Sequence, residues 1–368
     1  MKPIKILMLG GIACGKTTLL SSIIECAINN PIGQYLTVSD HTLIECGVGS
    51  IYDKTVELKN LLAKSPSIDF LVGRVGGHLI TQNTILVQEP GSSNSISLEF
   101  LEVPGSMLGS CHDTEIINKL DECDIIIVCI DTPYLMGPIN EQNKDICSES
   151  INHSVNCVAE VHNLLMNISN KEKLVLFVPL KCEKWAKEGR LGEVNNRIKD
   201  VYNHAINALL AYENMNVSII PIETVGNILF FEFKEPFLIT KENSISPKRC
   251  CKISYSIVRL EDGRLYKIKD SDLVYQDEHA CLWGTNLPKP NCWFNINSKN
   301  PSYSPKNGDQ LLIHILDFIV RKRSKTWKPF MQYFFPPDNL KWLEKILSHL
   351  DTRGLIIKDK DVIEILRN

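Results

Sequence analysis

The sequence lacks the features that mark several broad classes of protein. It has no run approaching the roughly 20 apolar residues of a membrane helix, so we expect no membrane span. Its 40 lysines and arginines nearly balance its 43 aspartates and glutamates, which gives no reason to expect a nucleic acid or a charged membrane surface as partner. The 13 cysteines are scattered, several of them inside apolar runs such as residues 127–130, where a free thiol packs as a small hydrophobe. This pattern argues against a disulfide scaffold and predicts a reducing, cytoplasmic environment.

Apolar and amphipathic segments alternate through the first part of the chain. Residues 4–9 are a short apolar run that leads straight into a glycine-rich loop, which is typical of a first buried strand and not of a signal peptide. Further strands are expected at residues 78–87, 95–103, 123–130, 173–178 and 217–222. Helices are expected at residues 16–27, 53–63, 114–122, 148–169 and 191–212. The alternation predicts an α/β fold in which a mostly parallel sheet carries helices on both faces.

This alternation stops after about residue 231. Residues 252–260 and 264–269 flank Glu261-Asp262-Gly263, a turn typical of a β-hairpin. Helices are expected again at residues 309–321 and 339–350. We therefore divide the chain into three parts. These are a main domain (1–231), a smaller β-containing insertion with a hairpin (232–306), and a last part (307–368) that supplies a closing helix to the main domain and a C-terminal helical extension.

Residues 10–17 fit the phosphate-binding pattern G-x-x-x-x-G-K-[ST]. Glycines let successive backbone N–H groups turn towards anionic phosphates, Lys16 would neutralise the outer phosphates, and the Thr17 hydroxyl would ligate Mg²⁺. A chance glycine-rich turn is the alternative, but an apolar strand precedes the loop and a helix follows it, as the motif requires. The nucleotide-binding residues expected here are Gly10, Gly11, Ile12, Ala13, Cys14, Gly15, Lys16, Thr17 and Thr18.

The phosphate loop alone does not distinguish ATP from GTP, but later segments resemble motifs of the Ras-like, translation-factor class of P-loop GTPases, in that family's order. Residues 102–105, Glu-Val-Pro-Gly, resemble the family's D-x-x-G. The resemblance implies that the Gly105 N–H senses the γ-phosphate and that Glu102, in place of aspartate, helps to hold Mg²⁺ through water. Ser106 stands where many members carry the glutamine that orients the attacking water.

Residues 180–183, Leu-Lys-Cys-Glu, resemble the guanine-recognising N/T-K-x-D. The resemblance implies that Lys181 lies along the base plane and that Glu183 accepts hydrogen bonds from the guanine N1–H and amino group, so GTP and GDP are the expected ligands. Thr224 lies where the family places its last base-contacting loop, a match by position only. The alternative for residues 180–183 is an ordinary solvated loop.

The switch threonine of the family should lie just before the first strand of the hairpin. Thr81 fits this place best, Thr84 is the alternative, and either one could be a plain strand threonine. The resemblance thus implies a metal site formed by Thr17, Thr81 and Glu102. The residues expected to take part in catalysis are Lys16, Thr81, Gly105 and Ser106.

More narrowly, residues 123–133 and 178–183 are similar to the bacterial double-GTPase-type family of conflict and defence gene clusters, whose members travel with regulator proteins. Ser106 is too short to replace glutamine. Arg74 is a candidate for an arginine finger in cis, and an ordinary solvated loop arginine is the alternative. The sequence therefore predicts a GTP-binding regulatory switch with slow, partner-dependent hydrolysis and a protein regulator or effector. The alternatives are a nucleotide-binding interaction protein with little hydrolysis, and a P-loop ATPase or kinase.

Overall fold

The computed structural model describes the greater part of residues 2–226 and a series of shorter segments beyond them. The described ranges are 2–11, 14–42, 50–64, 79–108, 114–136, 158–169, 171–226, 228–234, 237–240, 249–253, 257–260, 265–267, 274–277, 291–296, 302–326, 338–350, 355–358 and 361–364. The expectations for Ile12, Ala13 and Arg74 therefore lie outside the described residues.

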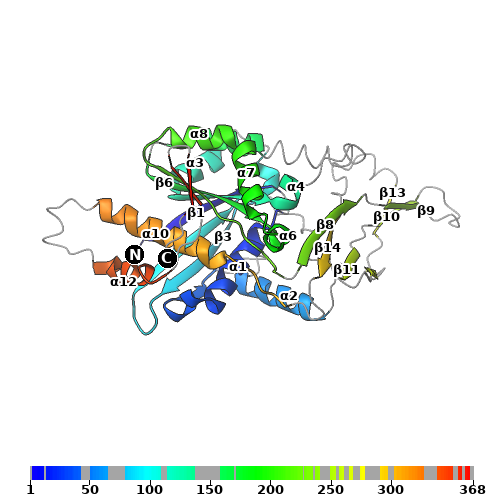
Figure 1. The fold of residues 1–368 in the computed structure, drawn as a ribbon, viewed down its shortest axis with the longest axis horizontal. Helices are drawn as coiled ribbons and strands as arrows, with labels where there is room; N and C mark the ends of the chain where they lie inside the picture. The colour runs from blue at the N-terminus through cyan, green and yellow to red at the C-terminus, as the bar shows by residue number, and fades with distance from the viewer. Residues whose placement is uncertain are drawn as a thin grey trace.

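A nine-stranded sheet in the order β16-β15-β7-β6-β5-β1-β4-β3-β2 forms the centre of the molecule (Figure 1). Its strands are β1 (Ile4–Gly10), β2 (Thr37–Asp40), β3 (Thr81–Gln88), β4 (Ser95–Glu102), β5 (Ile125–Asp131), β6 (Lys173–Leu180), β7 (Met215–Ile219), β15 (Leu355–Lys358) and β16 (Asp361–Glu364). The strands from β7 to β4 in this order run parallel, and antiparallel strands extend the sheet at both edges. The expected α/β fold, a mostly parallel sheet with helices on both faces, is confirmed.

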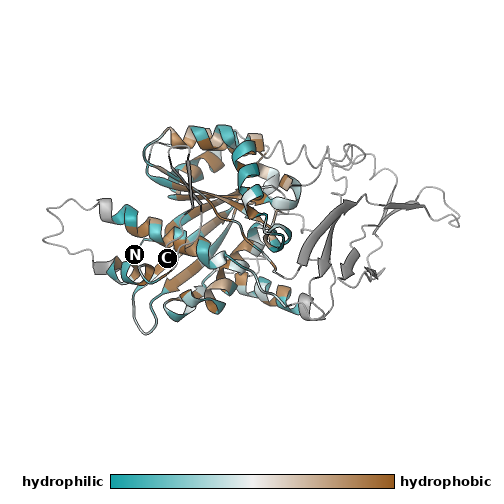
Figure 2. Cartoon of the chain, viewed as in Figure 1, coloured by the Kyte–Doolittle hydropathy of each residue, from teal (hydrophilic) through white to brown (hydrophobic). Residues whose placement is uncertain are grey.

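Both faces of the sheet are buried, which explains why its inner strands are continuous apolar runs. Along β1, Ile6 and Met8 belong to one hydrophobic core, whereas Leu7 and Leu9 belong to the other. In Figure 2 the hydrophobic colour accordingly concentrates on the strands and on the helix surfaces that face them. No helix within the described ranges is both long and apolar enough to cross a membrane.

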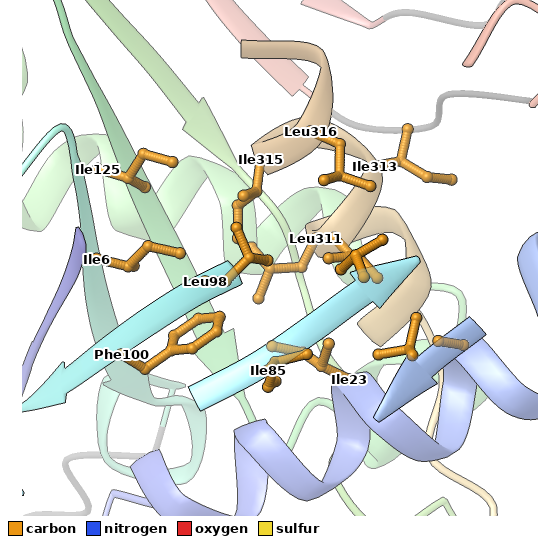
Figure 3. Packing of buried hydrophobic residues seen from close by; sticks show 14 of the residues in the cluster. Ile6, Ile23, Ile85, Leu98, Phe100, Ile125, Leu311, Ile313, Ile315 and Leu316 are labelled. Carbon is orange, nitrogen blue, oxygen red and sulfur yellow. The ribbon is translucent and has the colours of Figure 1, made fainter. Parts of the chain in front are cut away.

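Two layers of helices cover these faces. On the first face α1 (Lys16–Asn29), α10 (Gly308–Thr326) and α12 (Asp338–Leu347) pack against the sheet. Figure 3 shows side chains of α10, among them Leu311 and Ile315, gathered in one cluster with Leu98 and Phe100 of the sheet. The second face carries α3 (Thr114–Glu122), α4 (Thr132–Met136), α7 (Leu191–Val201), α8 (Asn203–Leu210) and the helical residues 158–166. α10 also packs directly on α1, as a closing helix would.

The structure differs from the sequence expectations in two places. The expected helix over 191–212 is divided into α7 and α8 at Tyr202, whose buried ring packs on Phe177 with the ring centroids 5.3 Å apart. Past α12 the chain is not only helical, because β15 and β16 form a hairpin that pairs with the edge strand β7. These two strands are four residues long, too short for a clear periodic signal.

The chain between the main sheet and α10 forms two smaller sheets. Their strands are β8 (Ile228–Lys234), β9 (Phe237–Thr240), β10 (Arg249–Ile253), β11 (Ile257–Leu260), β12 (Leu265–Lys267), β13 (Val274–Asp277) and β14 (Asn291–Ile296). One sheet has the order β13-β10-β9 and the other β12-β11-β14-β8. The strands β11 and β12 pair antiparallel on either side of residues 261–263, which lie outside the described residues, but residues 252 and 253, expected in the same strand as β11, belong to β10 of the other sheet.

Candidate functional site

The loop between β1 and α1 has a backbone that requires its glycines. Gly10 and Gly15 have φ angles of 153° and 109°. A Cβ atom on Gly10 would lie 2.6 Å from the carbonyl oxygen of Cys129 on β5, too close for any side chain. Within the part of the chain that the structure describes, no side chain caps the N-terminus of α1, and the first turn of this helix contains no acidic residue. The helix end therefore keeps backbone N–H groups for an anion.

Lys16 lies inside this loop and is only 6% exposed. Its ammonium donates hydrogen bonds to the carbonyl oxygens of Gly10, at 2.9 Å, and Gly11, at 3.2 Å. The Cys14 thiol is 4.0 Å from the same Nζ atom. The ammonium is thus held at the loop by two carbonyl oxygens, and its charge also acts on the carboxyl of Glu102.

The three residues expected to form a metal site lie together beside the loop. The Thr17 hydroxyl is 3.0 Å from both carboxylate oxygens of Glu102, to which it donates. Thr81 stands directly opposite Glu102 in the antiparallel pair of β3 and β4, whereas Thr84 stands opposite Glu99. Burial raises the pKa of the Glu102 carboxyl, and the charge of Lys16 and the Thr17 hydrogen bond oppose this shift.

Gly105 and Ser106 follow in a short 3₁₀ turn, Gly105–Met107, and the Ser106 side chain is exposed. This turn lies next to the phosphate loop because the Val103 N–H donates to the carbonyl of Met8, near the end of β1. The expected catalytic residues Lys16, Thr81, Gly105 and Ser106 therefore gather at one end of the sheet, although their roles in catalysis stay a prediction.

Lys181 lies between the phosphate loop and a second cluster of residues, which includes Glu183 and Thr224. It has a left-handed backbone with φ at 61°, and its Nζ atom is 2.6 Å from Oδ2 of Asp131, the last residue of β5. Its side chain passes beside the loop, since a Cβ atom on Gly15 would be 3.9 Å from its Cε atom. Lys181, one of the residues expected to contact a base, thus lies beside the phosphate loop.

Glu183 begins α6 (Glu183–Lys187) and is 4% exposed. Its Oε1 atom accepts hydrogen bonds from the N–H groups of Val225, at 2.7 Å, and Gly226, at 3.3 Å, and from the Thr224 hydroxyl, at 3.3 Å. Burial raises the pKa of this carboxyl, and the backbone donors partly offset the shift. The structure brings Glu183 and Thr224 together as the positional match implied, but this oxygen faces the 224–226 loop of its own chain.

Sequence reasoning missed the residues that support this loop. Ser22 of α1 donates from its hydroxyl to the carbonyl of Thr224, at 3.0 Å, and lies 3.3 Å from the Tyr303 hydroxyl. Residues 304 and 306 then pair with the loop through backbone hydrogen bonds, which include the bridge between Glu223 and Lys306. No local pattern could have revealed these residues, because they are about 80 positions further along the chain than the loop.

Comparison with known proteins finds only distant similarity. Neither a family model nor a curated protein matches the sequence. The signal recognition particle receptor SRb-GTP/SRX complex from Chaetomium thermophilum matches at a TM-score of 0.34 and 13% identity, over 62% of this chain and 93% of that one. The Ski7 GTPase-like domain of S. cerevisiae bound to GTP matches at 0.32 and 14%, over 60% of this chain and 42% of that one.

A third solved structure, the LeoA bacterial dynamin GTPase from ETEC, matches at a TM-score of 0.27 and 12% identity, over 59% of this chain and 29% of that one. Similarity at this level leaves the function to be inferred from the site itself. The bacterial defence family stays a prediction from the sequence motifs.

Proposed function

We propose that the chain is a cytoplasmic regulatory switch that binds a guanine nucleotide together with Mg²⁺. One observation carries this proposal: the Lys181 side chain lies beside Gly15 of the phosphate loop, where the base of a nucleotide bound at the loop would reach it. Phosphates would lie at the N-terminus of α1 against Lys16, and the base would lie beside Lys181.

The residues beside the loop fit a magnesium ion. A threonine hydroxyl and one carboxylate, completed by waters and nucleotide phosphates, are the oxygen ligands that Mg²⁺ prefers. Thr17, Thr81 and Glu102 would hold the ion, which when bound would neutralise charge on the phosphate oxygens. The chain's own contribution is to fix the hydroxyl and the carboxylate 3.0 Å apart beside the loop.

Slow hydrolysis is the second part of the proposal. Ser106 is exposed and short in the turn where a longer amide side chain would orient the attacking water. Turnover would then depend on a protein partner, and the insertion at residues 232–306 is the part that we propose to recognise it. A role in bacterial conflict or anti-phage defence follows from the sequence resemblance, and phage challenge of cells carrying the wild type or Lys16→Ala would test it.

A direct test is competition between GDP, GTP and ATP for the purified chain, with Mg²⁺ and with EDTA. We expect GDP and GTP to bind at least about tenfold more tightly than ATP, equivalent to about 1.4 kcal/mol. Mg²⁺ should strengthen GTP binding. Single-turnover hydrolysis should stay far below the roughly 10 per second of partner-stimulated GTPases. Faster turnover by the isolated chain would contradict the switch proposal.

One observation favours an alternative. The Glu183 oxygen that accepts from Val225, Gly226 and Thr224 is already engaged within the protein. If Glu183 keeps these bonds when ligand binds, the base is discriminated weakly, as in a P-loop ATPase or kinase. Equal or tighter binding of ATP in the competition experiment would support this alternative over guanine selectivity.

A further inference from the structure

The candidate site contains an ion pair between Asp131 and Lys181, and the proposed function assigns no role to Asp131. Asp131 Oδ2 and Lys181 Nζ are 2.6 Å apart, and the two side chains are only 13% and 18% exposed. The other oxygen, Asp131 Oδ1, is buried and has no hydrogen-bond partner among the described residues. Within the described structure, the side chain of Asp131 is therefore bonded to Lys181 alone.

The pairing of two neighbouring strands positions Asp131 close to Lys181. β5 and β6 are parallel neighbours, and their register sets Asp131 opposite Leu180, the residue before Lys181. The left-handed backbone of Lys181 then turns the chain from the end of β6 into α6. The Thr132 hydroxyl lies 3.3 Å from the Cys182 thiol, so contacts between the two strand ends continue past the ion pair.

A lysine side chain needs such a partner to keep one position. Its four-carbon stem is flexible and its ammonium is a compact charge with three rotatable donors. Water screens an ion pair less where both partners are largely removed from solvent. Oδ2 of Asp131 therefore fixes the end of a side chain whose stem lies beside Gly15 of the phosphate loop.

We propose that Asp131 is a positioning residue for nucleotide recognition: it holds Lys181 in the conformation in which its stem forms one wall of the base pocket. This inference rests on the proposed function, because it requires that a base lies beside Lys181. It predicts that the effect of Asp131 on binding is transmitted through Lys181.

A double-mutant cycle tests the coupling. Asp131→Asn keeps the shape of the side chain and removes its charge, and Lys181→Met keeps the length of the stem. GDP affinity is measured for the wild type, both single variants and the double variant. We expect Asp131→Asn to weaken GDP binding about tenfold when Lys181 is present and less than about twofold in the Lys181→Met background. Discrimination of GDP from ADP should fall in parallel.

The matched control is Asp121→Asn. Asp121 also pairs with a lysine at 2.7 Å, Lys171, but both side chains are exposed and away from the site. This variant should leave GDP affinity unchanged. Thermal unfolding of each variant checks the fold, and if Asp131→Asn does not fold, Asp131→Glu carries the same test, because it retains the charge and displaces it by one methylene.

The outcomes separate the two proposals. Equal effects of Asp131→Asn in both backgrounds, no effect in the wild type, or tighter binding would overturn the role of Asp131 while leaving nucleotide binding intact. Failure of the wild type to bind GDP and GTP would instead overturn the proposed function, and the role of Asp131 with it. If Asp131→Asn weakens GDP binding only when Lys181 is present, the result supports the proposal.

Discussion

The two ends of the candidate site are constructed differently. The phosphate end comes almost entirely from one continuous stretch, Gly10 to Thr17, with Glu102 added by the neighbouring parallel strand. The base end is assembled from four separate segments, which supply Asp131, Lys181 to Glu183, Thr224 to Gly226, and Tyr303 to Lys306. A phosphate site can therefore be formed by local geometry, whereas the base site depends on the complete fold.

The ends differ in their charges as well. The Lys16 ammonium is bonded to neutral carbonyl groups, and its charge also favours the ionised form of Glu102. At the base end the Lys181 charge is neutralised by Asp131, and Glu183 is held by donors of its own chain. We infer that the phosphate end supplies most of the affinity and the base end supplies selectivity.

Lys16→Ala, a change at the phosphate end, should have the largest effect on nucleotide affinity. Removing the buried ammonium deletes the main counter-charge for the phosphates, and we expect nucleotide affinity to fall about 100-fold or more, equivalent to about 2.7 kcal/mol. Titration with fluorescent GDP measures the loss. Lys171→Ala, which removes an exposed lysine, is the control. Retained affinity in Lys16→Ala would show that the phosphates bind elsewhere.

Gly226→Ala should damage the base end alone. Gly226 has a φ of 93°, and a new Cβ atom would lie 2.0 Å from the Ser304 carbonyl oxygen. We expect a loss of about 2 to 3 kcal/mol in the free energy of unfolding, together with weaker discrimination between GDP and ADP. Gly91→Ala is the matched control, because Gly91 also has a positive φ, 72°, but has open space around its Cβ position. Equal losses in both variants would attribute the effect to backbone strain.

Tyr303→Phe should give a smaller effect. It removes the hydroxyl that lies 3.3 Å from Ser22 and keeps the buried ring. The expected cost is about 1 kcal/mol in the free energy of unfolding, measured by urea denaturation. Tyr212→Phe, at a partly exposed position, should cost less. A neutral result for Tyr303→Phe would mean that this hydroxyl does not help to support the base loop.

The smallest expected effect concerns pH. Burial raises the pKa of Glu183 in the folded chain above the ordinary value of 4.5. The folded state then binds more protons than the unfolded state between these two values, so this residue lowers stability as pH rises through that interval. Glu183→Gln should flatten this part of the stability profile. Glu193→Gln, an exposed residue whose pKa is lowered by Arg190, should not flatten it.

The sequence predicted those features that depend on neighbouring residues. The phosphate loop follows a fixed spacing, and the strands around it are apolar because both sheet faces are buried. The proximity of Thr17, Glu102 and Thr81 followed from the order of the motifs, and the register of β3 and β4 agrees with it.

The remaining features depend on contacts that no local pattern encodes. The oxygen of Glu183 faces residues 224–226, and Asp131 meets Lys181 across two strand ends. Burial of Tyr202 against Phe177 accompanies a break in a helix that looked continuous in the sequence. The β15 strand pairs with β7, a partner far away along the chain, and β16 pairs with β15.

The backbone bridge between Glu223 and Lys306 has a consequence for how this protein could have been built. The chain leaves the main domain after Gly226 and re-enters it at Ser302, and the bridge holds the exit and the entrance side by side. Because the entropy of closing a loop grows only slowly with its length, about 0.6 kcal/mol for each doubling, we expect this junction to accept inserts of different lengths. The strand β8 contacts α6, the helix that begins with Glu183, so a replacement of the intervening sheets would have to preserve this contact.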